Sequence, residues 1–358
     1  MRGKTVLILF LAAASLTPQP ARAAVVPALN ISKLAAEASL IVVGEVKSLS
    51  EEETGDFDIE GQMRKARRLA GVLRVDRVIK GIADAEVSFR SYMPLDDFSG
   101  FATVQAKHFG MFFFRATAEG LGFVSPHYPS ILAVREGCST KNTPMSGREI
   151  GRIATEIECI LKSPVAIRRD LVTAIEYFRT VPAANAIPAL KAAGPELTSP
   201  LDVLAASVLL QHNDLSMLPL VEKSLRKSSK LFVQAEGSQW EFVLSAALTY
   251  IKDPAAIPAL SRLMSSPDEQ TRRDAAGALR KIGTEAVIAP LSKALYDEDW
   301  EVRWKAVMGL AGVARSDEDN ESWYPSHAAF KQNEQHYLDH WREWVKKKGI
   351  ELKTTDKL

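Results

Sequence analysis

The feature that most constrains this chain is a pattern that recurs between residues 183 and 315. Each unit starts with an apolar residue followed within two positions by proline, at Ile187, Leu218, Ile257 and Ile288. Successive starts are 31, 39 and 31 residues apart. A period of this length is typical of stacked helix pairs, in which each unit buries its apolar face against the next. The sequence therefore predicts an α-solenoid, which offers a binding surface and supplies no chemistry of its own.

Apolar residues at helical spacing place the helices within the solenoid, residues 165–315. The expected helices cover residues 184–193, 201–210, 216–227, 238–251, 254–264, 269–282, 285–295 and 300–313. Arg272 and Arg303 occupy the same position in two units, and each follows an aspartate by four residues, Asp268 or Asp299. This spacing predicts an ion pair within each helix, with a structural role rather than a ligand-binding one.

The segments 253–260 (DPAAIPAL) and 271–279 (TRRDAAGAL) resemble the HEAT-like repeat in its short form, the PBS-lyase type. The resemblance covers roughly the repeated region, because proline, arginine and alanine recur in register. It implies an α-solenoid of helix pairs that binds a protein or peptide. It does not imply bilin attachment, since the repeat also occurs in proteins without a chromophore.

The first residues have the three parts of a secretory signal peptide. Arg2 and Lys4 precede an apolar segment, residues 6–14, and Ala21-Arg22-Ala23 forms a cleavage signal. We therefore expect residues 1–23 to be removed and the rest to be a soluble periplasmic or extracellular protein. The apolar segment is too short for a retained membrane span.

The net charge bears on which partners the chain could bind, and the cysteines bear on whether it contains a disulfide. The chain has 358 residues, enough for two domains, and a net charge of +1, which gives no electrostatic reason to expect nucleic acid. In an oxidising compartment its two cysteines, Cys138 and Cys159, are expected to form a disulfide. A reactive thiol pair is less favoured because the CxxC spacing is absent.

Before the helices, residues 24–137 carry several short β-patterned segments separated by turn residues. Expected strands cover residues 40–46, 69–80, 85–93, 101–105, 110–117 and 122–124. Gly44 indicates a bulge or a close backbone approach. The acidic and then basic residues 51–68 are interpreted as a solvated hairpin loop. The pattern predicts a small antiparallel β-barrel, closed or partly closed.

The segments 38–46, 74–81 and 112–114 resemble a β domain that is distantly similar to the netrin-like, OB-type barrel of metalloproteinase inhibitors. The chelating N-terminal cysteine of those inhibitors is missing, since the expected mature chain starts at Ala24. The resemblance therefore implies a barrel but not protease inhibition. Residues 138–164 are expected to be a connector with a helix, and residues 316–358 a capping helix and tail.

The candidate partner-binding surface lies in the irregular second unit. Its extra residues fall at 228–239, and insertions in such arrays form loops that often contact the partner. The candidate residues are four cations and two aromatic anchors, namely Lys223, Arg226, Lys227, Lys230, Phe232 and Trp240. In the alternative interpretation, the two aromatic side chains fold back and cover their own helix pair.

No nucleophile elbow, phosphate loop or zinc signature is present. His336 and His340 have a spacing that can bind a metal, but the spacing fixes no third ligand. We therefore expect no catalytic residue, no metal site and no cofactor. The predicted function is that of an exported non-catalytic scaffold or adaptor for a protein or peptide. The alternative is an inhibitor or chaperone-like regulator of an exported hydrolase, acting through the N-terminal barrel.

Overall fold

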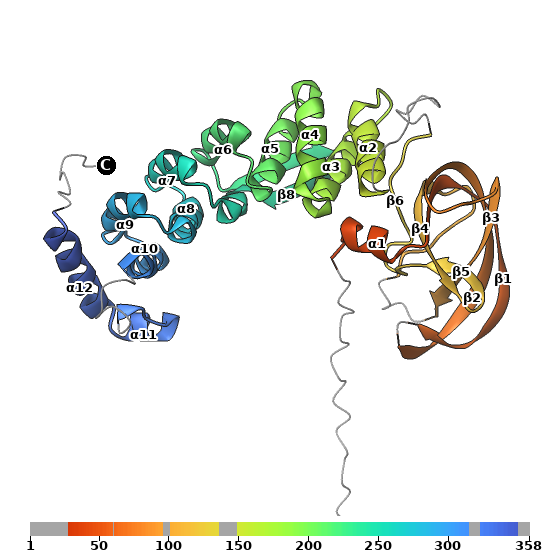
Figure 1. Cartoon of the computed structure of the whole chain (residues 1–358), viewed down its shortest axis with the longest axis horizontal. Helices are drawn as coiled ribbons and strands as arrows, with labels where there is room; N and C mark the ends of the chain where they lie inside the picture. The colour runs from red at the N-terminus through yellow and green to blue at the C-terminus, as the bar shows by residue number, and fades with distance from the viewer. Residues whose placement is uncertain (1–27, 60, 96–100, 136–148, 315–322, 350–358) are drawn as a thin grey trace, which may run out of the picture.

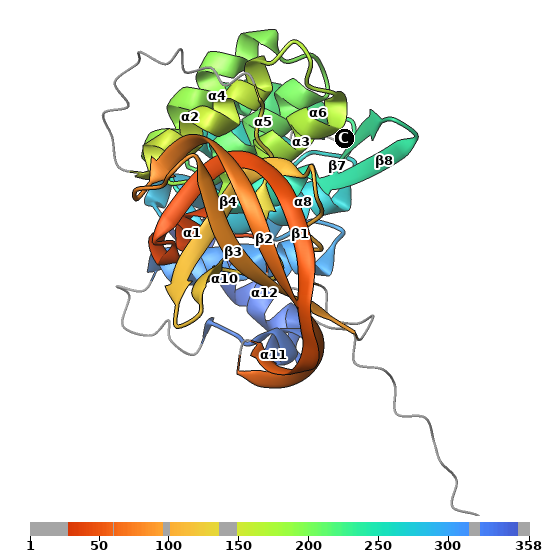
Figure 2. The ribbon, with the colours of Figure 1, turned by 90° about the vertical axis from the view of Figure 1, so that its right-hand side faces the viewer.

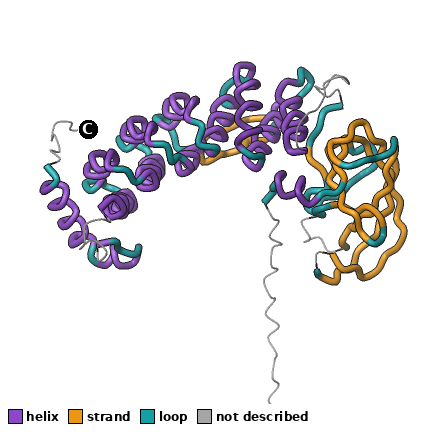
Figure 3. Tube along the Cα trace, in the orientation of Figure 1, coloured by secondary structure: helices purple, strands orange, loops and turns teal. Residues whose placement is uncertain are grey.

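The computed structural model describes residues 28–59, 61–95, 101–135, 149–314 and 323–349. Strands gather at one end of the molecule, and helices follow one another away from it, from α2 beside the strands to α12 at the far end (Figure 1). One further strand pair lies among the helices (Figure 3). The chain is thus a mixed structure, with a β-rich N-terminal region and a helical C-terminal region.

The N-terminal region is a single six-stranded sheet. Its strands are β1 (Leu40–Ile59), β2 (Gln62–Lys80), β3 (Glu86–Pro94), β4 (Phe109–Thr117), β5 (Gly120–Phe123) and β6 (Ser130–Ile131). The strand order is β1-β2-β3-β5-β4-β6, and β1 also pairs with β4. Strands β3 and β5 run parallel and meet only at Arg90 and Gly122. The region is therefore not a closed antiparallel barrel: it is a curved sheet in which β3 and β5 are parallel and are joined through a single residue pair.

Both faces are buried over residues 40–43 of β1 and residues 110–114 of β4, which explains the uninterrupted apolar sequences there. On one face, Val42, Phe112 and Phe114 belong to a core enclosed by the curved sheet. On the other face, Ile41 and Phe113 belong to the large core that continues into the helices. The β region and the helical region therefore share one hydrophobic core.

Residues 51–59 and 62–68 form a largely exposed hairpin, as the sequence predicts, but they are paired strand where a loop was expected. These residues continue β1 and β2 as a long hairpin, in which Glu53 pairs with Arg68 and Asp56 with Lys65. Opposite charges directly across two paired strands stabilise the pairing. The acidic residues of β1 and the basic residues of β2 therefore stabilise this hairpin. The strand expected at residues 101–105 is also absent, since these residues have no regular structure.

The close backbone approach expected at Gly44 is confirmed. The pairing of β1 with β2 is irregular between Val43 and Gly44. A Cβ atom at position 44 would lie 2.1 Å from the carbonyl oxygen of Arg74. Only glycine fits there without moving the neighbouring strand.

The helical region consists of short helices in pairs. They are α2 (Glu149–Lys162), α3 (Arg168–Tyr177), α4 (Ala183–Ala193), α5 (Leu201–Gln211), α6 (Leu218–Leu225), α7 (Ile257–Leu263), α8 (Glu269–Ile282), α9 (Ile288–Ala294), α10 (Trp300–Val313), α11 (His327–Gln332) and α12 (Glu334–Lys347), with α1 (Ile31–Glu37) preceding the sheet. Short 3-10 helices join them: η1 (Phe178–Thr180), η2 (Gly194–Glu196), η3 (Leu215–Met217), η4 (Leu244–Tyr250), η5 (Pro254–Ala256) and η6 (Glu285–Val287). The second helices of successive pairs, α5, η4, α8 and α10, contact one another in that order.

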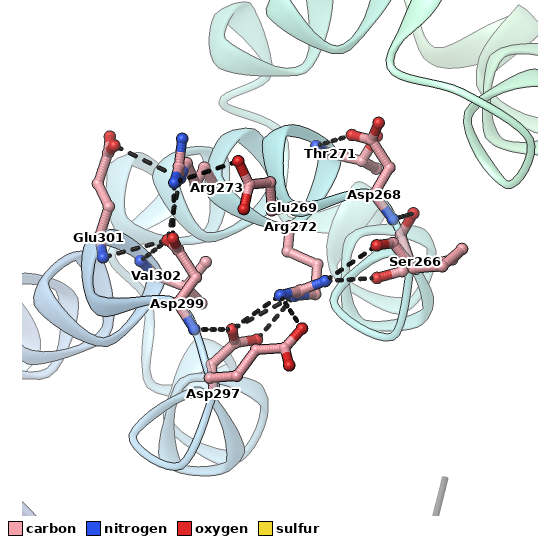
Figure 4. A network of polar contacts seen from close by, with 12 residues as sticks. Ser266, Asp268, Glu269, Thr271, Arg272, Arg273, Asp297, Asp299, Glu301 and Val302 are labelled. Atoms are coloured by element: carbon pink, nitrogen blue, oxygen red, sulfur yellow. Dashed lines mark hydrogen bonds and ion pairs between the residues drawn. The ribbon is translucent and has the colours of Figure 1, made fainter.

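Arginines connect successive units, as Figure 4 shows for Arg272. Arg272 donates to the carbonyl oxygen of Ser266 in its own unit (2.9 Å) and to Asp297 in the next unit (3.0 Å). Arg303 likewise donates to the carbonyl oxygen of Asp297 (2.7 Å) and pairs with Glu334 in the unit that follows. The predicted ion pairs within each helix were therefore wrong. The two arginines join neighbouring units instead.

The aspartates assigned to those pairs are helix N-caps. Asp268 accepts a hydrogen bond from the backbone N–H of Thr271, and Asp299 accepts one from that of Val302. Asp299 also pairs with Arg273 of the preceding unit at 2.6 Å (Figure 4). This hydrogen bond from Arg273 is the main reason why the pKa of Asp299 is lowered. Capping thus takes the place of the expected local pairing.

The insertion in the second unit forms a β-hairpin, not a loop. Strand β7 (Lys230–Ala235) pairs with β8 (Ser238–Val243), and the hairpin stands out from the helices when the molecule is viewed along the row (Figure 2). The helix expected at residues 238–251 is therefore wrong over its first half. Only residues 244–250 are helical, as η4.

The far end of the row is covered by two helices where the sequence predicts one. Helix α12 contacts α9 and α10, and its Trp341 is fully buried. The break between α11 and α12 lies at Asn333, whose φ of −135° is outside the helical range. The expected capping role is consistent with these contacts.

Polar contacts fix the sheet to the first helices. The Arg77 side chain on β2 binds both carboxylate oxygens of Glu156 on α2, at 2.9 and 2.7 Å. Its Nη2 also donates to the carbonyl oxygen of Val134 at 2.9 Å. On the neighbouring α1, the N–H of Ile31 donates to the Thr180 hydroxyl at 3.1 Å. These contacts hold the β region against the start of the helical row.

Candidate functional site

The six predicted partner-binding residues lie in the second helical unit and its hairpin. Lys223 and Arg226 lie on or directly after α6, Lys227 follows them, Lys230 and Phe232 lie on β7, and Trp240 lies on β8. All except Trp240 are exposed. The structure therefore places the four cations and one of the two aromatic residues at the surface.

Phe232 and Trp240 lie on opposite faces of the hairpin. Side chains alternate along β7, so Phe232 points outward and is 47% exposed, whereas Val233 points inward and is fully buried. Trp240 pairs with Val233 and packs against the main core. Trp240 therefore agrees with the alternative interpretation, in which the ring covers its own helix pair, and not with that of a surface anchor. Phe232 remains a candidate contact residue.

The four cations differ in what they bind. Lys230 pairs with Glu241 across the hairpin at 2.7 Å, and Arg226 pairs with Glu222 on α6 at 2.9 Å. Within the described part of the chain, Lys223 and Lys227 form no ion pair. The surface around the end of α6 thus carries positive charge that the chain itself leaves unbalanced.

Glu222 binds two of the arginine side chains at this surface, those of Arg226 and Arg262. Its side chain is only 8% exposed, and it accepts hydrogen bonds from Nε and Nη2 of Arg262 on α7 at 2.7 and 2.8 Å. These hydrogen bonds, followed by the one from Arg226, hold the pKa of Glu222 at about 2, well below its usual 4.5. The carboxylate is therefore ionised at neutral pH and clamps two guanidinium groups.

These groups line an open cavity between α6 and α7, of about 360 Å³, which we call the α6–α7 notch. Its lining residues are Pro219, Glu222, Lys223, Arg226 and Arg262. Arg262 and Glu222 were missing from the sequence-based set. The repeat offered a signal for Arg262, because it stands five residues after Ile257, as Lys223 does after Leu218.

A second cavity, of about 430 Å³, lies between the α9–α10 connection and α12. Its charged groups already bind other parts of the chain: Arg303 pairs with Glu334, and Arg342 donates to the carbonyl oxygen of Leu295 at 2.8 Å. Arg342 also lies over the ring of Tyr296, 4.2 Å from its centroid. This cavity belongs to the packing of the terminal helices.

The histidines at the C-terminal end contact aromatic rings. His340 stacks on Trp323 with ring centroids 3.6 Å apart, and His336 lies 4.7 Å from the same ring. Burial lowers the pKa of His340, so its neutral form is favoured. Among the residues described, no group of three histidine, cysteine or acidic side chains could hold a metal ion.

Two sequence-based expectations fall outside the described residues. Cys159 is buried on α2, but Cys138 belongs to the segment 136–148, so the disulfide stays a prediction. The predicted signal peptide lies within residues 1–27 and also stays a prediction. No helix in the described part of the chain has the length and apolar character that crossing a membrane requires.

Comparison with known families supports the repeat assignment. Residues 242–311, which contain η4, α7, α8, α9 and most of α10, match the family of HEAT repeats. Comparison with curated proteins gives no match for this chain. The HEAT match covers the two units in which arginines bridge to the next unit. HEAT repeats are often modules of protein interaction.

Proposed function

We propose that this protein is a non-catalytic scaffold or adaptor that binds a protein or peptide partner through its helical repeats. In this proposal the helical region is an α-solenoid, and the chain is exported to the periplasm or the outside. The observation that carries the proposal is the unbalanced surface at the end of α6. Lys223 and Lys227 lack an ion pair within the described residues, and Phe232 is exposed on the hairpin that follows.

Rigidity supports a binding role for this surface. Helix α6 contacts both α5 and α7, and Arg262 of α7 binds Glu222 of α6 through two hydrogen bonds. A surface held in this way loses little conformational freedom when a partner binds, which favours affinity. The exposed ring of Phe232 and the exposed side chain of Arg226 are of the residue types that protein interfaces favour.

The hairpin provides an internal comparison that tests the proposal. Phe232→Ala removes an exposed ring, so we expect the free energy of unfolding to change by less than about 0.5 kcal/mol. Trp240→Ala removes a ring packed on the core, so we expect a loss of roughly 2–4 kcal/mol. Tyr296→Ala is the matched control, since Tyr296 is also exposed but lies two units away.

The readout is capture of partner proteins by the immobilised full chain from an extract of its own compartment. We expect Phe232→Ala to lose proteins that the wild type and Tyr296→Ala retain. If Phe232→Ala and Tyr296→Ala capture the same proteins in the same amounts as the wild type, the hairpin surface is not the contact. The proposal would then lose its main support.

A further inference from the structure

The guanidinium groups of the α6–α7 notch use only part of their hydrogen-bonding capacity. Arg262 binds Glu222 through Nε and Nη2, and Arg226 binds it through Nη2 alone. Within the described residues, Nη1 of Arg262 and both Nε and Nη1 of Arg226 donate to nothing. The two side chains are 54% and 62% exposed. Each guanidinium group thus has an inner edge, which binds Glu222, and an outer edge, which is accessible to a ligand.

Charge in the notch favours an anion. Three cations, Lys223, Arg226 and Arg262, line it together with the single carboxylate of Glu222. Because the whole chain carries a net charge of only +1, this excess is a local feature. Charges beyond about 8 Å are largely screened at physiological ionic strength, so the local excess decides what binds.

We propose that the α6–α7 notch binds the carboxylate side chains of an acidic, extended peptide segment of a partner protein. This inference rests on the proposed function and names the chemistry of its partner. The inner edges of the two arginines already bind one carboxylate, that of Glu222, with distances of 2.7 to 2.9 Å. The outer edges present the same planar donor geometry to a carboxylate from outside.

The rest of the notch suits a peptide better than a free anion. Pro219 lines it and is exposed. Prolines give the apolar part of a peptide a rigid surface to pack on, which a small inorganic anion does not need. Because the cavity of about 360 Å³ is open to solvent, a chain can pass across it while its side chains enter.

The test compares two labelled synthetic peptides binding to the full-length protein, measured by fluorescence anisotropy. One is a twelve-residue peptide in which glutamate alternates with serine, and the other has glutamine at every glutamate position. The variant Lys223→Gln/Arg226→Gln removes two notch cations and leaves Glu222 bound to Arg262 through two hydrogen bonds. The matched control, Lys293→Gln/Lys252→Gln, removes two exposed cations outside the notch.

We expect the glutamate peptide to bind at least about tenfold more tightly than the glutamine peptide. The notch variant should weaken its binding about tenfold, since each exposed charge contributes up to about 1 kcal/mol, whereas the control should change it less than about twofold. The inference would be overturned if both peptides bound with equal affinity. It would also be overturned if the notch variant and the control variant lost equal affinity for the glutamate peptide. A phosphoserine peptide that binds tenfold more tightly than the glutamate peptide would overturn it as well.

The peptide-binding and capture experiments together distinguish failure of the acidic-peptide inference from failure of the proposed function. If neither peptide binds, but Phe232→Ala still loses a captured protein, the acidic-peptide inference fails and the proposed function stands. If neither peptide binds and Phe232→Ala captures as the wild type does, both fail.

Discussion

The contact between Arg77 and Glu156 is expected to couple the β region to the helices. Arg77 on β2 binds Glu156 on α2 through two hydrogen bonds, and its Nη1 and Nη2 donate to the carbonyl oxygens of Arg135 and Val134 at 3.2 and 2.9 Å. The Glu156 side chain is only 1% exposed. Replacing Arg77 with methionine therefore leaves a buried carboxylate without its counter-charge.

The loss of stability expected for Arg77→Met follows from the burial of the Glu156 carboxylate. Removing one partner of a buried ion pair destabilises a protein by about 3–5 kcal/mol, because the remaining charge is neither solvated nor paired. The double variant Arg77→Met/Glu156→Leu removes both charges, so it should recover most of this loss. Lys47→Met is the control, because Lys47 pairs with Glu86 at the surface and should cost less than about 1 kcal/mol.

Urea unfolding followed by two probes measures both the loss and the coupling. The six tryptophans all lie at position 240 or later, so their fluorescence reports the helical region, whereas far-UV circular dichroism reports both regions. We expect coincident transitions in the wild type. In Arg77→Met the circular dichroism transition should begin at a lower urea concentration than the fluorescence transition. Equal losses in Arg77→Met and Lys47→Met would refute this reasoning.

Two further predictions concern the helical region. Because the pKa of Glu222 is about 2 when folded and 4.5 ordinarily, its ionised form stabilises the protein above pH 4.5, and this contribution is lost as pH falls towards 2. Glu222→Gln should therefore cost about 1–2 kcal/mol in urea unfolding at pH 7 and almost nothing at pH 2, the half-exposed arginines limiting the effect. Arg272→Met removes the bridge to Asp297 and should cost about 3–5 kcal/mol in the same measurement, against less than about 1 for the exposed Arg226→Gln. Equal losses for Arg272→Met and Arg226→Gln would show that the bridge is not stabilising.

The regular parts of the fold could be predicted from sequence because local signals and packing agree there. Helices α8 and α10 span residues 269–282 and 300–313, as the apolar spacing predicts. Both helices begin directly after an aspartate N-cap, Asp268 or Asp299, although the sequence analysis assigned these two aspartates to ion pairs. Gly44 was identified for a similar reason, since glycine inside a strand signals a close approach.

The errors arose where tertiary pairing decides the structure. The charges of residues 51–68 suggest a solvated loop when each half is considered alone, but the two halves neutralise each other across β1 and β2. For Trp240 the sequence left two interpretations open, a surface anchor or a cover for its own helix pair, because sequence alone does not reveal the face of a hairpin on which a residue lies. Its pairing with Val233 decides that. Glu222 was missed because its role depends on Arg262, 40 residues later.

Site-specific photo-crosslinking at position 232 tests the central claim most directly. A benzophenone-bearing phenylalanine analogue replaces Phe232 in the full-length protein, and the same analogue at Tyr296, exposed on another unit, serves as the control. If the hairpin and the end of α6 form the partner-binding surface, irradiation in the native compartment yields a discrete protein adduct at position 232 and none of that size at position 296. No adduct at position 232, or identical adducts at both positions, would contradict the account.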